Sequence, residues 1–362
     1  MAISELQVQT ALKSAIDPNT NKDFVSGKTV RNIKISGNDV ALEVMLGYPA
    51  QSQLGIIRQI VTEQLKTITG IGRVDVTVSF KIVSHSVQRG VKLIPGVKNI
   101  IAVASGKGGV GKSTTAVNLA LALAAEGASV GMLDADIYGP SQPTMLGVQG
   151  RPESRDGKSL EPMEAHGLQI MSIGFLIDPE TPMVWRGPMV TQALEQLLND
   201  TRWRELDYLV VDLPPGTGDI QLTLAQRVPV TGAVIVTTPQ DIALIDARKG
   251  LKMFEKVGIP ILGIVENMSI HICSKCGQEE HIFGEGGGKK MSGDYEVEFL
   301  GALPLDIRIR QEADAGAPTV VTAPDSRIAE IYRQIARRVA VKVAEQAQDH
   351  SSAFPKIVIQ NT

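Results

Sequence analysis

The feature that most restricts the fold of this chain is a glycine-rich loop between an apolar segment and a helical run. The apolar segment Ile100–Ala104 is followed closely by Gly106-Lys107-Gly108-Gly109-Val110-Gly111-Lys112-Ser113, which fits the pattern G-x-x-x-x-G-K-[ST]. Glycines at these positions let backbone N–H groups turn inward around a phosphate, and the next helix adds its positive N-terminal end. An ordinary glycine-rich turn is the alternative. The pattern predicts a phosphate-binding loop.

The residues of this loop have separate predicted roles in holding a nucleotide. Lys112 is expected to reach the β- and γ-phosphates, and the Ser113 hydroxyl is expected to bind Mg²⁺. The predicted nucleotide contacts within the loop are Gly106, Lys107, Gly108, Gly109, Val110, Gly111, Lys112, Ser113 and Thr114.

Continuous apolar runs alternate with amphipathic segments after residue 99. Such runs are typical of parallel strands that helices bury on both faces. The expected strands are 100–104, 130–133, 209–212, 232–237 and 261–266, with a short edge strand at 298–302. The expected helices are 113–126, 189–199, 219–227, 242–257 and 326–346. We predict an α/β domain over 99–347, with a mostly parallel sheet flanked by helices, and a C-terminal tail over 348–362.

Aspartates end two of these strands, at the sheet edge where a phosphate site would need them. Asp212 ends the run 209–212 and is predicted to hold Mg²⁺, and Gly216 in the turn beyond it could sense the γ-phosphate through its N–H. Asp134, a predicted nucleotide contact, and Asp136 follow the run 130–133. On an extended strand these two face opposite ways, so only one of them can point at the nucleotide. A strand-end aspartate that merely caps the next helix is the alternative.

Residues 1–80 show a different pattern. Helical spacing over 6–16 and 53–66 alternates with strand-like segments at 30–35, 40–46 and 74–80, and Gly37-Asn38 predicts a hairpin between the first two strands. This order predicts a small α+β domain over 1–80, joined by a linker over 81–98. Basic residues outnumber acidic ones up to residue 98 and the reverse holds beyond it, so the two parts have different surfaces.

The two cysteines of the chain stand together in Cys273-Ser274-Lys275-Cys276. This spacing lets two thiolates bind one metal ion or cluster, but tetrahedral zinc and a cubane cluster each need four ligands. Three completions are open from the residues: two copies of the chain share one [4Fe–4S] cluster, His271 and His281 complete a zinc site within one chain, or the pair is a redox switch. An accidental spacing is the fourth alternative.

Composition excludes several classes of function. The chain has 36 Lys and Arg against 39 Asp and Glu and only 4% aromatic residues, so we expect no nucleic-acid partner. The N-terminus lacks the pattern of a secretory signal, and no run of 18 apolar residues is present, so we expect no membrane span. Two cysteines in a chain of this length indicate a reducing compartment, and we expect a cytoplasmic protein.

Lys107 goes beyond the general loop pattern, because it places a second lysine inside the loop. The loop with Lys107 resembles that of the MinD/ParA class, and the chain over 99–345 looks like the Mrp/ApbC branch of P-loop iron–sulfur carriers, which are relatives of the Nbp-type cluster scaffolds. The further segments that carry this resemblance are Leu133-Asp134-Ala135-Asp136-Ile137-Tyr138-Gly139-Pro140-Ser141, Trp185-Arg186-Gly187-Pro188-Met189, Asp212-Leu213-Pro214-Pro215-Gly216-Thr217-Gly218-Asp219, Glu266-Asn267-Met268-Ser269 and Ile282-Phe283-Gly284-Glu285-Gly286-Gly287.

The resemblance implies roles for residues that spacing alone does not assign. Lys107 would act in trans on the nucleotide of a homodimer partner, Asp136 would orient the attacking water, and Asn267 would contact adenine. With Lys107 requiring a dimer, Cys273 and Cys276 would share a [4Fe–4S] cluster with a second copy. The implied activity is slow ATP hydrolysis that accompanies transfer of clusters to apo iron–sulfur proteins, with cluster-assembly scaffold proteins as further partners.

The segment 1–80 resembles the MIP18-type module that accompanies such carriers. It departs from that pattern at Gly47-Tyr48-Pro49-Ala50-Gln51, where many members carry a cysteine, so we interpret it as a docking domain.

The main rival function is a MinD/ParA-like spatial-positioning ATPase on a membrane or DNA. The sequence feature that would favour this rival most is the basic predicted C-terminal helix. We expect its basic residues Arg333, Arg337 and Arg338 to form a solvated face, and we expect its apolar residues to form a stripe that packs on the sheet. A phosphotransferase, the second rival, has no acceptor-site signature here.

Overall fold

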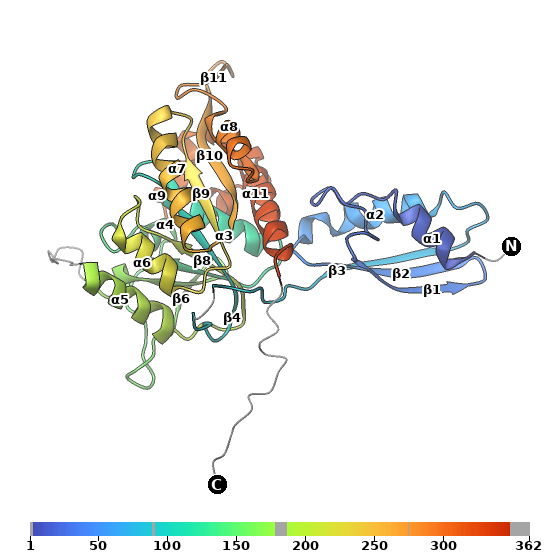
Figure 1. Ribbon diagram of the computed structural model, residues 1–362, viewed down its shortest axis with the longest axis horizontal. Helices are drawn as coiled ribbons and strands as arrows, with labels where there is room; N and C mark the ends of the chain where they lie inside the picture. The colour runs from blue at the N-terminus through green and yellow to red at the C-terminus, as the bar shows by residue number, and fades with distance from the viewer. Residues whose placement is uncertain (1–2, 89–90, 178–186, 274, 348–362) are drawn as a thin grey trace, which may run out of the picture.

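The computed structural model describes the chain except for residues 1–2, 89–90, 178–186, 274 and 348–362. It contains a small N-terminal domain and a larger α/β domain, which lie side by side along the longest axis of the molecule (Figure 1). The predicted tail, Ser274, and Trp185 and Arg186 of the family-like segments fall outside the described residues.

The N-terminal domain packs two helices on one face of a three-stranded sheet (Figure 1). Its elements are α1 (Glu5–Leu12), β1 (Val30–Ser36), β2 (Asp39–Leu46), α2 (Leu54–Leu65) and β3 (Val74–Phe80). The central strand β2 is antiparallel to β1 and parallel to β3. The α+β prediction and the hairpin at Gly37 are confirmed, whereas the helix expected over 6–16 ends at Leu12, because Ile16 instead bridges to Asp23.

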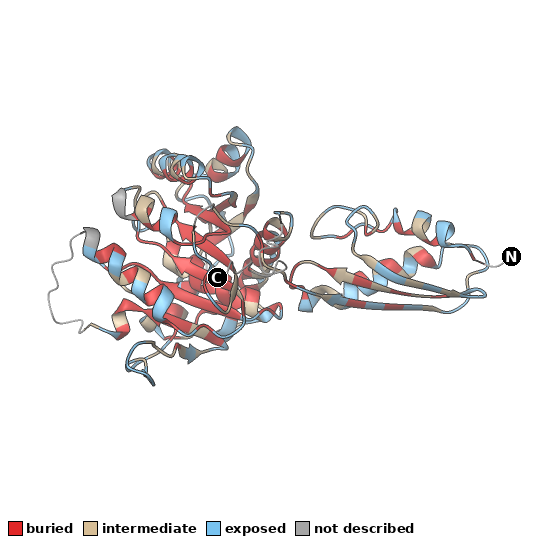
Figure 2. Cartoon of the chain, turned by 60° about the horizontal axis from the view of Figure 1, so that its bottom comes forward, coloured by how far each residue is buried: buried red, intermediate tan, exposed pale blue. Residues whose placement is uncertain are grey.

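Periodicity explains which face of each element is buried. Every second residue of β2 faces the helices, and every fourth residue of α2 faces the sheet. These buried side chains are Val40, Leu42, Val44 and Leu46 of β2 and Ile57, Val61 and Leu65 of α2. The opposite face of the sheet is more exposed (Figure 2).

The larger domain is built on a nine-stranded sheet. Its strands are β4 (Val97–Ala104), β5 (Val130–Asp134), β6 (Met163–Ala165), β7 (Leu168–Ser172), β8 (Leu206–Asp212), β9 (Gly232–Thr237), β10 (Ile261–Ile272), β11 (Glu279–Glu280) and β12 (Phe299–Leu305). The order is β11-β10-β9-β4-β8-β5-β7-β6, with β12 beside β10, and β6 and β11 alone run antiparallel to their neighbours among the described strands. The prediction of a mostly parallel α/β sheet is confirmed.

Helices cover the faces of this sheet, so its strands are buried almost throughout (Figures 1 and 2). They are α3 (Lys112–Ala125), α4 (Gln142–Met145), α5 (Gly187–Asp200), α6 (Asp219–Arg227), α7 (Asp241–Lys256), α8 (Gly287–Asp294), α9 (Ile307–Asp314), α10 (Thr319–Thr322) and α11 (Arg327–Ala344). The phosphate-loop helix α3 packs against α11. No helix in the described part of the chain has the length and apolar character needed to cross a membrane.

The structure differs from the sequence-based expectation at three places in the sheet. Strand β4 begins at Val97, inside the segment expected to be linker, and the β6–β7 hairpin was not expected at all. Strand β10 continues to Ile272 instead of ending at Glu266. Its register shifts between Glu266 and Ile270, where Met268 has a φ of 56°, so the strand bulges and then resumes.

The two domains meet at the far end of the phosphate-loop helix. Glu126 caps the C-terminus of α3 and is fully buried, and its carboxylate accepts hydrogen bonds from the Ser52 N–H at 3.0 Å and the Ser52 hydroxyl at 2.7 Å. Arg337 of α11 pairs with the same carboxylate, and also with Glu330 at 2.8 Å. Arg337 is therefore buried at the junction, and the expectation that it lies on a solvated basic face is wrong.

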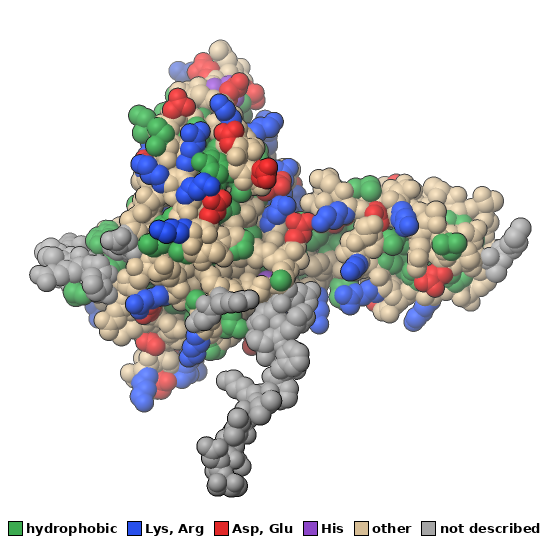
Figure 3. All heavy atoms as spheres, viewed as in Figure 1, with side chains coloured by type: hydrophobic (Ala, Val, Ile, Leu, Met, Phe, Trp, Pro, Cys, Tyr) green, Lys and Arg blue, Asp and Glu red, His purple; other side chains and the backbone are tan. Residues whose placement is uncertain are grey.

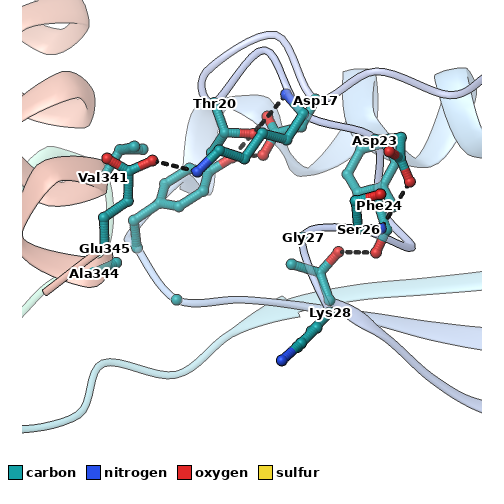
Figure 4. Close-up of a pocket in the computed structure, with 14 residues that line it drawn as sticks. Asp17, Thr20, Asp23, Phe24, Ser26, Gly27, Lys28, Val341, Ala344 and Glu345 are labelled. Atoms are coloured by element: carbon teal, nitrogen blue, oxygen red, sulfur yellow. Dashed lines mark hydrogen bonds and ion pairs between the residues drawn. The ribbon is translucent and has the colours of Figure 1, made fainter. Parts of the chain in front are cut away.

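A second contact closes the junction on its other side. Lys22 of the N-terminal domain pairs with Glu345, just after α11, at 2.7 Å. Between these elements lies a cavity of about 570 Å³, lined by residues of the 17–29 loop, by Tyr48 and by Val341, Ala344 and Glu345 (Figure 4). The Tyr48 hydroxyl donates to the buried carboxylate of Asp17 at 2.7 Å, which fixes one wall of this cavity.

The buried pair at the junction yields a stability prediction. Glu126→Ala should lower the free energy of unfolding by roughly 3 kcal/mol, because Arg337 would keep a buried charge without its buried partner. The matched control is Asp314→Ala, which removes the exposed pair with Arg310 and should cost about 0.5 kcal/mol or less. Urea unfolding of both variants measures the difference, and equal losses would contradict the assigned role of Glu126.

Candidate nucleotide and thiol site

The phosphate loop connects β4 to α3 at the carboxyl edge of the sheet. Gly109 and Gly111 have φ values of 81° and 79°, a region that residues with a Cβ rarely adopt, and Gly111 is the N-cap of α3. The Ser105 hydroxyl donates to the Lys107 carbonyl at 2.9 Å, which fixes the start of the loop. The loop is therefore already shaped as the sequence pattern requires.

Gly106 sets the distance between this loop and α7. A Cβ at Gly106 would lie 2.1 Å from the backbone carbon of Asp246 and 2.5 Å from the Ala247 nitrogen. A Cβ at Gly108 would meet nothing within 4 Å. Of these two glycines, only Gly106 must lack a side chain because of packing, since a Cβ there would overlap the backbone of α7.

Lys112 and the two predicted Mg²⁺ ligands form one buried cluster. The Lys112 ammonium donates to Asp212 Oδ1 and, at 3.1 Å, to Ser113 Oγ. The Lys112 side chain is 5% exposed and the Asp212 side chain is fully buried. The ammonium thus lies between Ser113 Oγ and Asp212 Oδ1, which belong to the two residues predicted to bind Mg²⁺. This is a site where a divalent cation would fit.

Gln142, the first residue of α4, is a member of this cluster that the sequence did not reveal. Its Nε2 donates to Asp212 Oδ2 at 3.0 Å and to the Ser113 carbonyl at 3.1 Å, and the residue is fully buried. A glutamine in a polar loop usually lies in solvent, so nothing in the local sequence marks this one as buried.

The carboxylates of Asp134 and Asp136 have different hydrogen-bond partners. The Asp134 carboxylate accepts hydrogen bonds from the N–H groups of Asp136, Ser141 and Gln142 and from the Ser172 hydroxyl, at 3.0 to 3.1 Å. All these donors belong to the protein itself, so Asp134 anchors the loop between β5 and α4. Burial, together with the charge of neighbouring Asp212, raises the pKa of Asp134 to about 7 against the opposition of these donors.

Asp136 is more accessible than Asp134 and accepts one hydrogen bond from the Gly139 N–H at 3.3 Å. Burial raises the pKa of Asp136, whereas the nearby Lys112 charge lowers it. Among the described residues, the Asp136 carboxylate thus has fewer protein donors than that of Asp134.

Gly216 lies against the phosphate loop. Its N–H, which was predicted to sense the γ-phosphate, donates to the Ser105 carbonyl at 3.0 Å, and its φ is 105°. The Gln221 side chain donates to the Pro214 carbonyl in the same turn. The turn after β8 is thus held against the phosphate loop.

Asn267 also contacts the phosphate loop. Its Nδ2 donates to the Val110 carbonyl at 2.9 Å, and its Oδ1 accepts from the Met268 N–H at 2.9 Å. The amide that was predicted to contact adenine therefore already holds the loop in place. Next to it, the buried Glu266 carboxylate accepts from the N–H groups of Gly286 and Gly288 at 3.3 and 2.6 Å, which fixes the start of α8.

The thiol pair lies at the end of β10, in the tip of the β10–β11 hairpin. The Cys273 N–H donates to the Gln278 carbonyl at 2.9 Å, and the Gly277 N–H donates to the Cys273 carbonyl at 2.8 Å. Cys273 is half-buried and Cys276 is exposed. The N–H of Lys275, followed by the N–H and thiol of Cys276, lowers the pKa of Cys273, which favours the thiolate that binds metals. The hairpin projects at one end of the domain, where acidic and histidine side chains are also exposed (Figures 1 and 3).

Of the two histidines proposed for a zinc site, His281 has both ring nitrogens engaged, whereas His271 has a partner at Nδ1 alone. The ring of His281 is 2.8 Å from the Ser269 carbonyl through Nδ1 and 2.8 Å from Glu285 through Nε2. His271 Nδ1 is 3.1 Å from the Leu305 carbonyl. Over the described residues, no three His, Cys, Asp or Glu side chains are grouped to hold a metal ion. The described part of one chain thus holds no assembled group of three metal ligands around the two thiols.

Lys107 is not part of the Lys112 cluster. It is half-buried, and among the described residues its ammonium forms no hydrogen bond or ion pair. The structure therefore brings Lys112, Ser113, Asp212 and Gln142 together, keeps Asp136 beside them, and leaves Lys107 without a partner in the described part of its own chain.

Comparison with known families covers both domains. Residues 96–340 match the family described as NUBPL iron-transfer P-loop NTPase, and residues 5–78 match the family described as iron-sulfur cluster assembly protein. The two matches correspond to the two domains of the fold.

Relatives of known name agree with these families. The iron-sulfur cluster carrier protein of Salmonella typhimurium is 52% identical over 332 residues, which cover 91% of this chain and 90% of the relative. The iron-sulfur cluster transfer protein NUBPL of Mus musculus is 53% identical over 250 residues, 68% of this chain and 78% of the relative.

Solved structures share the fold of the larger domain. A nucleotide-binding protein of Archaeoglobus fulgidus, solved in complex with ADP, superimposes with a TM-score of 0.55 at 40% identity, covering 61% of this chain and 87% of that one. The cell division ATPase MinD of Pyrococcus furiosus superimposes with a TM-score of 0.51 at 23% identity, covering 67% and 98%, which shows the common fold.

The packing of the loop on α7 yields a prediction for the nucleotide-free protein. Gly106→Ala should lower the free energy of unfolding by about 1–3 kcal/mol, because the new Cβ would overlap the backbone of Asp246. Gly108→Ala, whose Cβ would lie in open space, should change it by about 0.5 kcal/mol or less. Denaturant unfolding without nucleotide makes the comparison, and two indistinguishable variants would show that the loop does not pack on α7 in this way.

Proposed function

Because the chain belongs to the family of NUBPL iron-transfer P-loop NTPases, we propose that it is an ATP-binding carrier of iron–sulfur clusters. In this proposal two copies of the chain hold one [4Fe–4S] cluster and transfer it to apo iron–sulfur proteins, and slow ATP hydrolysis accompanies the transfer. The cluster is the cargo of the protein.

The main observation in support of this proposal is that β10 contacts the phosphate loop and ends next to the thiol pair. Asn267 in this strand donates to the phosphate loop at Val110, and Cys273 follows its last residue, Ile272. Cys273 is six positions beyond Asn267, which is at most about 20 Å of extended chain. One strand thus joins the nucleotide site to the thiol pair, so a change at the phosphate loop has a short path to the cargo site.

The chemistry of the cluster supports the dimer. A [4Fe–4S] cluster needs four thiolates, and the chain has two cysteines. The pair is at the tip of a projecting hairpin with Cys276 exposed, so a second copy has access to it. An exposed cluster is also one that an acceptor protein can reach. The projecting hairpin would thus allow a second copy to share the cluster and an acceptor protein to receive it.

The nucleotide site supports ATP and Mg²⁺ as the resident ligands. Ser113 and Asp212 would hold Mg²⁺, and the position of the Lys112 ammonium between their oxygen atoms indicates that this space suits a cation. When bound, Mg²⁺ would neutralise charge on the β- and γ-phosphates. Lys112 would then turn to the phosphates, and Asp136 would orient the attacking water.

Lys107 supports a role for the second copy. Its ammonium has no partner among the described residues, and a half-buried lysine in a phosphate loop is placed to meet additional negative charge. In the proposed dimer it would contact the nucleotide of the partner subunit. The N-terminal domain, which lacks cysteine, would dock the carrier on target proteins or on cluster-assembly scaffold proteins.

The shared cluster yields a prediction on metal loading. After anaerobic reconstitution, the wild type should hold about four irons per dimer and absorb in the thiolate-to-iron charge-transfer region. Cys273→Ser and Cys276→Ser should each lose the iron, because either change removes two of the four ligands of the dimer. His281→Ala is the control and should keep the iron, since its ring is bound to Ser269 and Glu285. Iron retained by either serine variant would contradict the shared site.

The two loop lysines yield a separate prediction. Lys112→Ala should abolish nucleotide binding, because it removes the ammonium that reaches the phosphates. Lys107→Ala should still bind ATP but should fail to dimerise upon binding it. Titration calorimetry measures the binding, and size-exclusion chromatography with light scattering measures the mass. An unchanged ATP-dependent dimer in Lys107→Ala would rule out its action in trans.

A further inference from the structure

Gln142 is one of three glutamines in the described part of the chain with an unpaired buried Oε1, and of these three it is the one whose Nε2 contacts Asp212 and Ser113. Its Nε2 is shared between Asp212 Oδ2 and the Ser113 carbonyl, but its Oε1 is buried and has no hydrogen-bond donor among the described residues. An unpaired buried amide oxygen costs about 1–3 kcal/mol, so such an atom calls for a donor in some state of the protein.

A 180° rotation of the Gln142 amide would not give its unpaired oxygen a hydrogen-bond donor. If Oε1 and Nε2 exchanged places, the oxygen would face the Asp212 carboxylate and the Ser113 carbonyl, which are both acceptors. The hydrogen-bond pattern therefore fixes Nε2 toward these two residues and leaves Oε1 of the same amide buried without a donor.

The backbone of Gln142 is fixed as firmly as its side chain. Its N–H donates to Asp134 Oδ2 at 3.0 Å, and the same carboxylate oxygen accepts from the Ser141 N–H and the Ser172 hydroxyl. Asp134 thus holds the start of α4 against the edge of the sheet. Gln142 therefore enters the cation site from a loop that Asp134 has made rigid.

The donor that fits this oxygen is a water molecule bound to the nucleotide's metal ion. Mg²⁺ loses its waters reluctantly and keeps several of them in nucleotide sites, so its hydration shell needs acceptors around it. Asp212 and Ser113, the two predicted ligands, are also the two residues that Gln142 Nε2 contacts. A water on a cation held there would lie beside the amide.

We propose that Gln142 is a positioning residue for the Mg²⁺ of the bound nucleotide. Its Nε2 holds Asp212 and the Ser113 backbone in place, and its Oε1 accepts a hydrogen bond from a Mg²⁺-bound water. This inference rests on the proposed nucleotide function and adds to it a residue that acts through the metal's hydration shell.

The test compares two substitutions by their need for Mg²⁺. Gln142→Leu keeps the size of the side chain but removes donor and acceptor, and it should raise the Mg²⁺ concentration for half-maximal ATP binding about 10-fold or more. Gln88→Leu is the matched control, because Gln88 also donates through Nε2 to a backbone carbonyl, that of Ala225, and has an unpaired buried Oε1, and this variant should stay within about 3-fold of the wild type. Titration calorimetry at a series of Mg²⁺ concentrations supplies the values, and nucleotide affinity in EDTA should be similar for all three proteins.

The outcomes separate this inference from the proposed function. Wild-type protein that binds no nucleotide would overturn the proposed function and this inference with it. A Gln142→Leu variant with normal Mg²⁺ dependence, or a Gln88→Leu variant impaired as strongly as Gln142→Leu, would overturn this inference alone. If a variant fails to fold, the wild-type structure with Mg²⁺ and ADP decides: Oε1 within hydrogen-bond distance of a metal-bound water supports the role, and Oε1 turned away from the metal overturns it.

Discussion

The buried pair of Lys112 and Asp212 is the interaction on which the site depends. Each charge alone would cost several kcal/mol to bury, so each requires the other while no nucleotide is present. The pairing of β4 with β8 places Asp212 beside the start of the loop, and Lys112 begins the helix that leaves it. In the proposed nucleotide complex, Lys112 would contact the phosphates and Asp212 would hold Mg²⁺, so each buried charge would again have a partner of opposite sign.

The elements around this pair connect it to the rest of the molecule. Strand β10 contacts the loop through Asn267 and ends at the thiol pair, while helix α3 runs from Lys112 to Glu126, where the N-terminal domain is docked. Both connections are formed by regular elements rather than by loops. The proposed cargo site and docking domain are thus each joined to the nucleotide site by a single element of secondary structure.

Local patterns made the loop and Asp212 predictable, because strand, glycine-rich loop and helix follow one another directly in sequence. The extension of β10 was not predictable, because Asn267 and Met268 read as the end of a strand until the bulge is seen. Neither was Gln142, whose burial depends on the fold of the loop that Asp134 holds. The burial of Arg337 depends on a separate domain that docks against α11, so helical periodicity alone placed it in solvent. Contacts between elements distant in sequence account for each of these misses.

The central claim is that one chain supplies two of the four thiolate ligands of a [4Fe–4S] cluster and a second copy supplies the other two. Sedimentation of the anaerobically reconstituted, iron-loaded protein tests it most directly, with absorbance followed in the cluster band. The account predicts that the cluster absorbance sediments with the mass of two chains and that the apoprotein without nucleotide sediments more slowly. A fully loaded species with the mass of a single chain would contradict it.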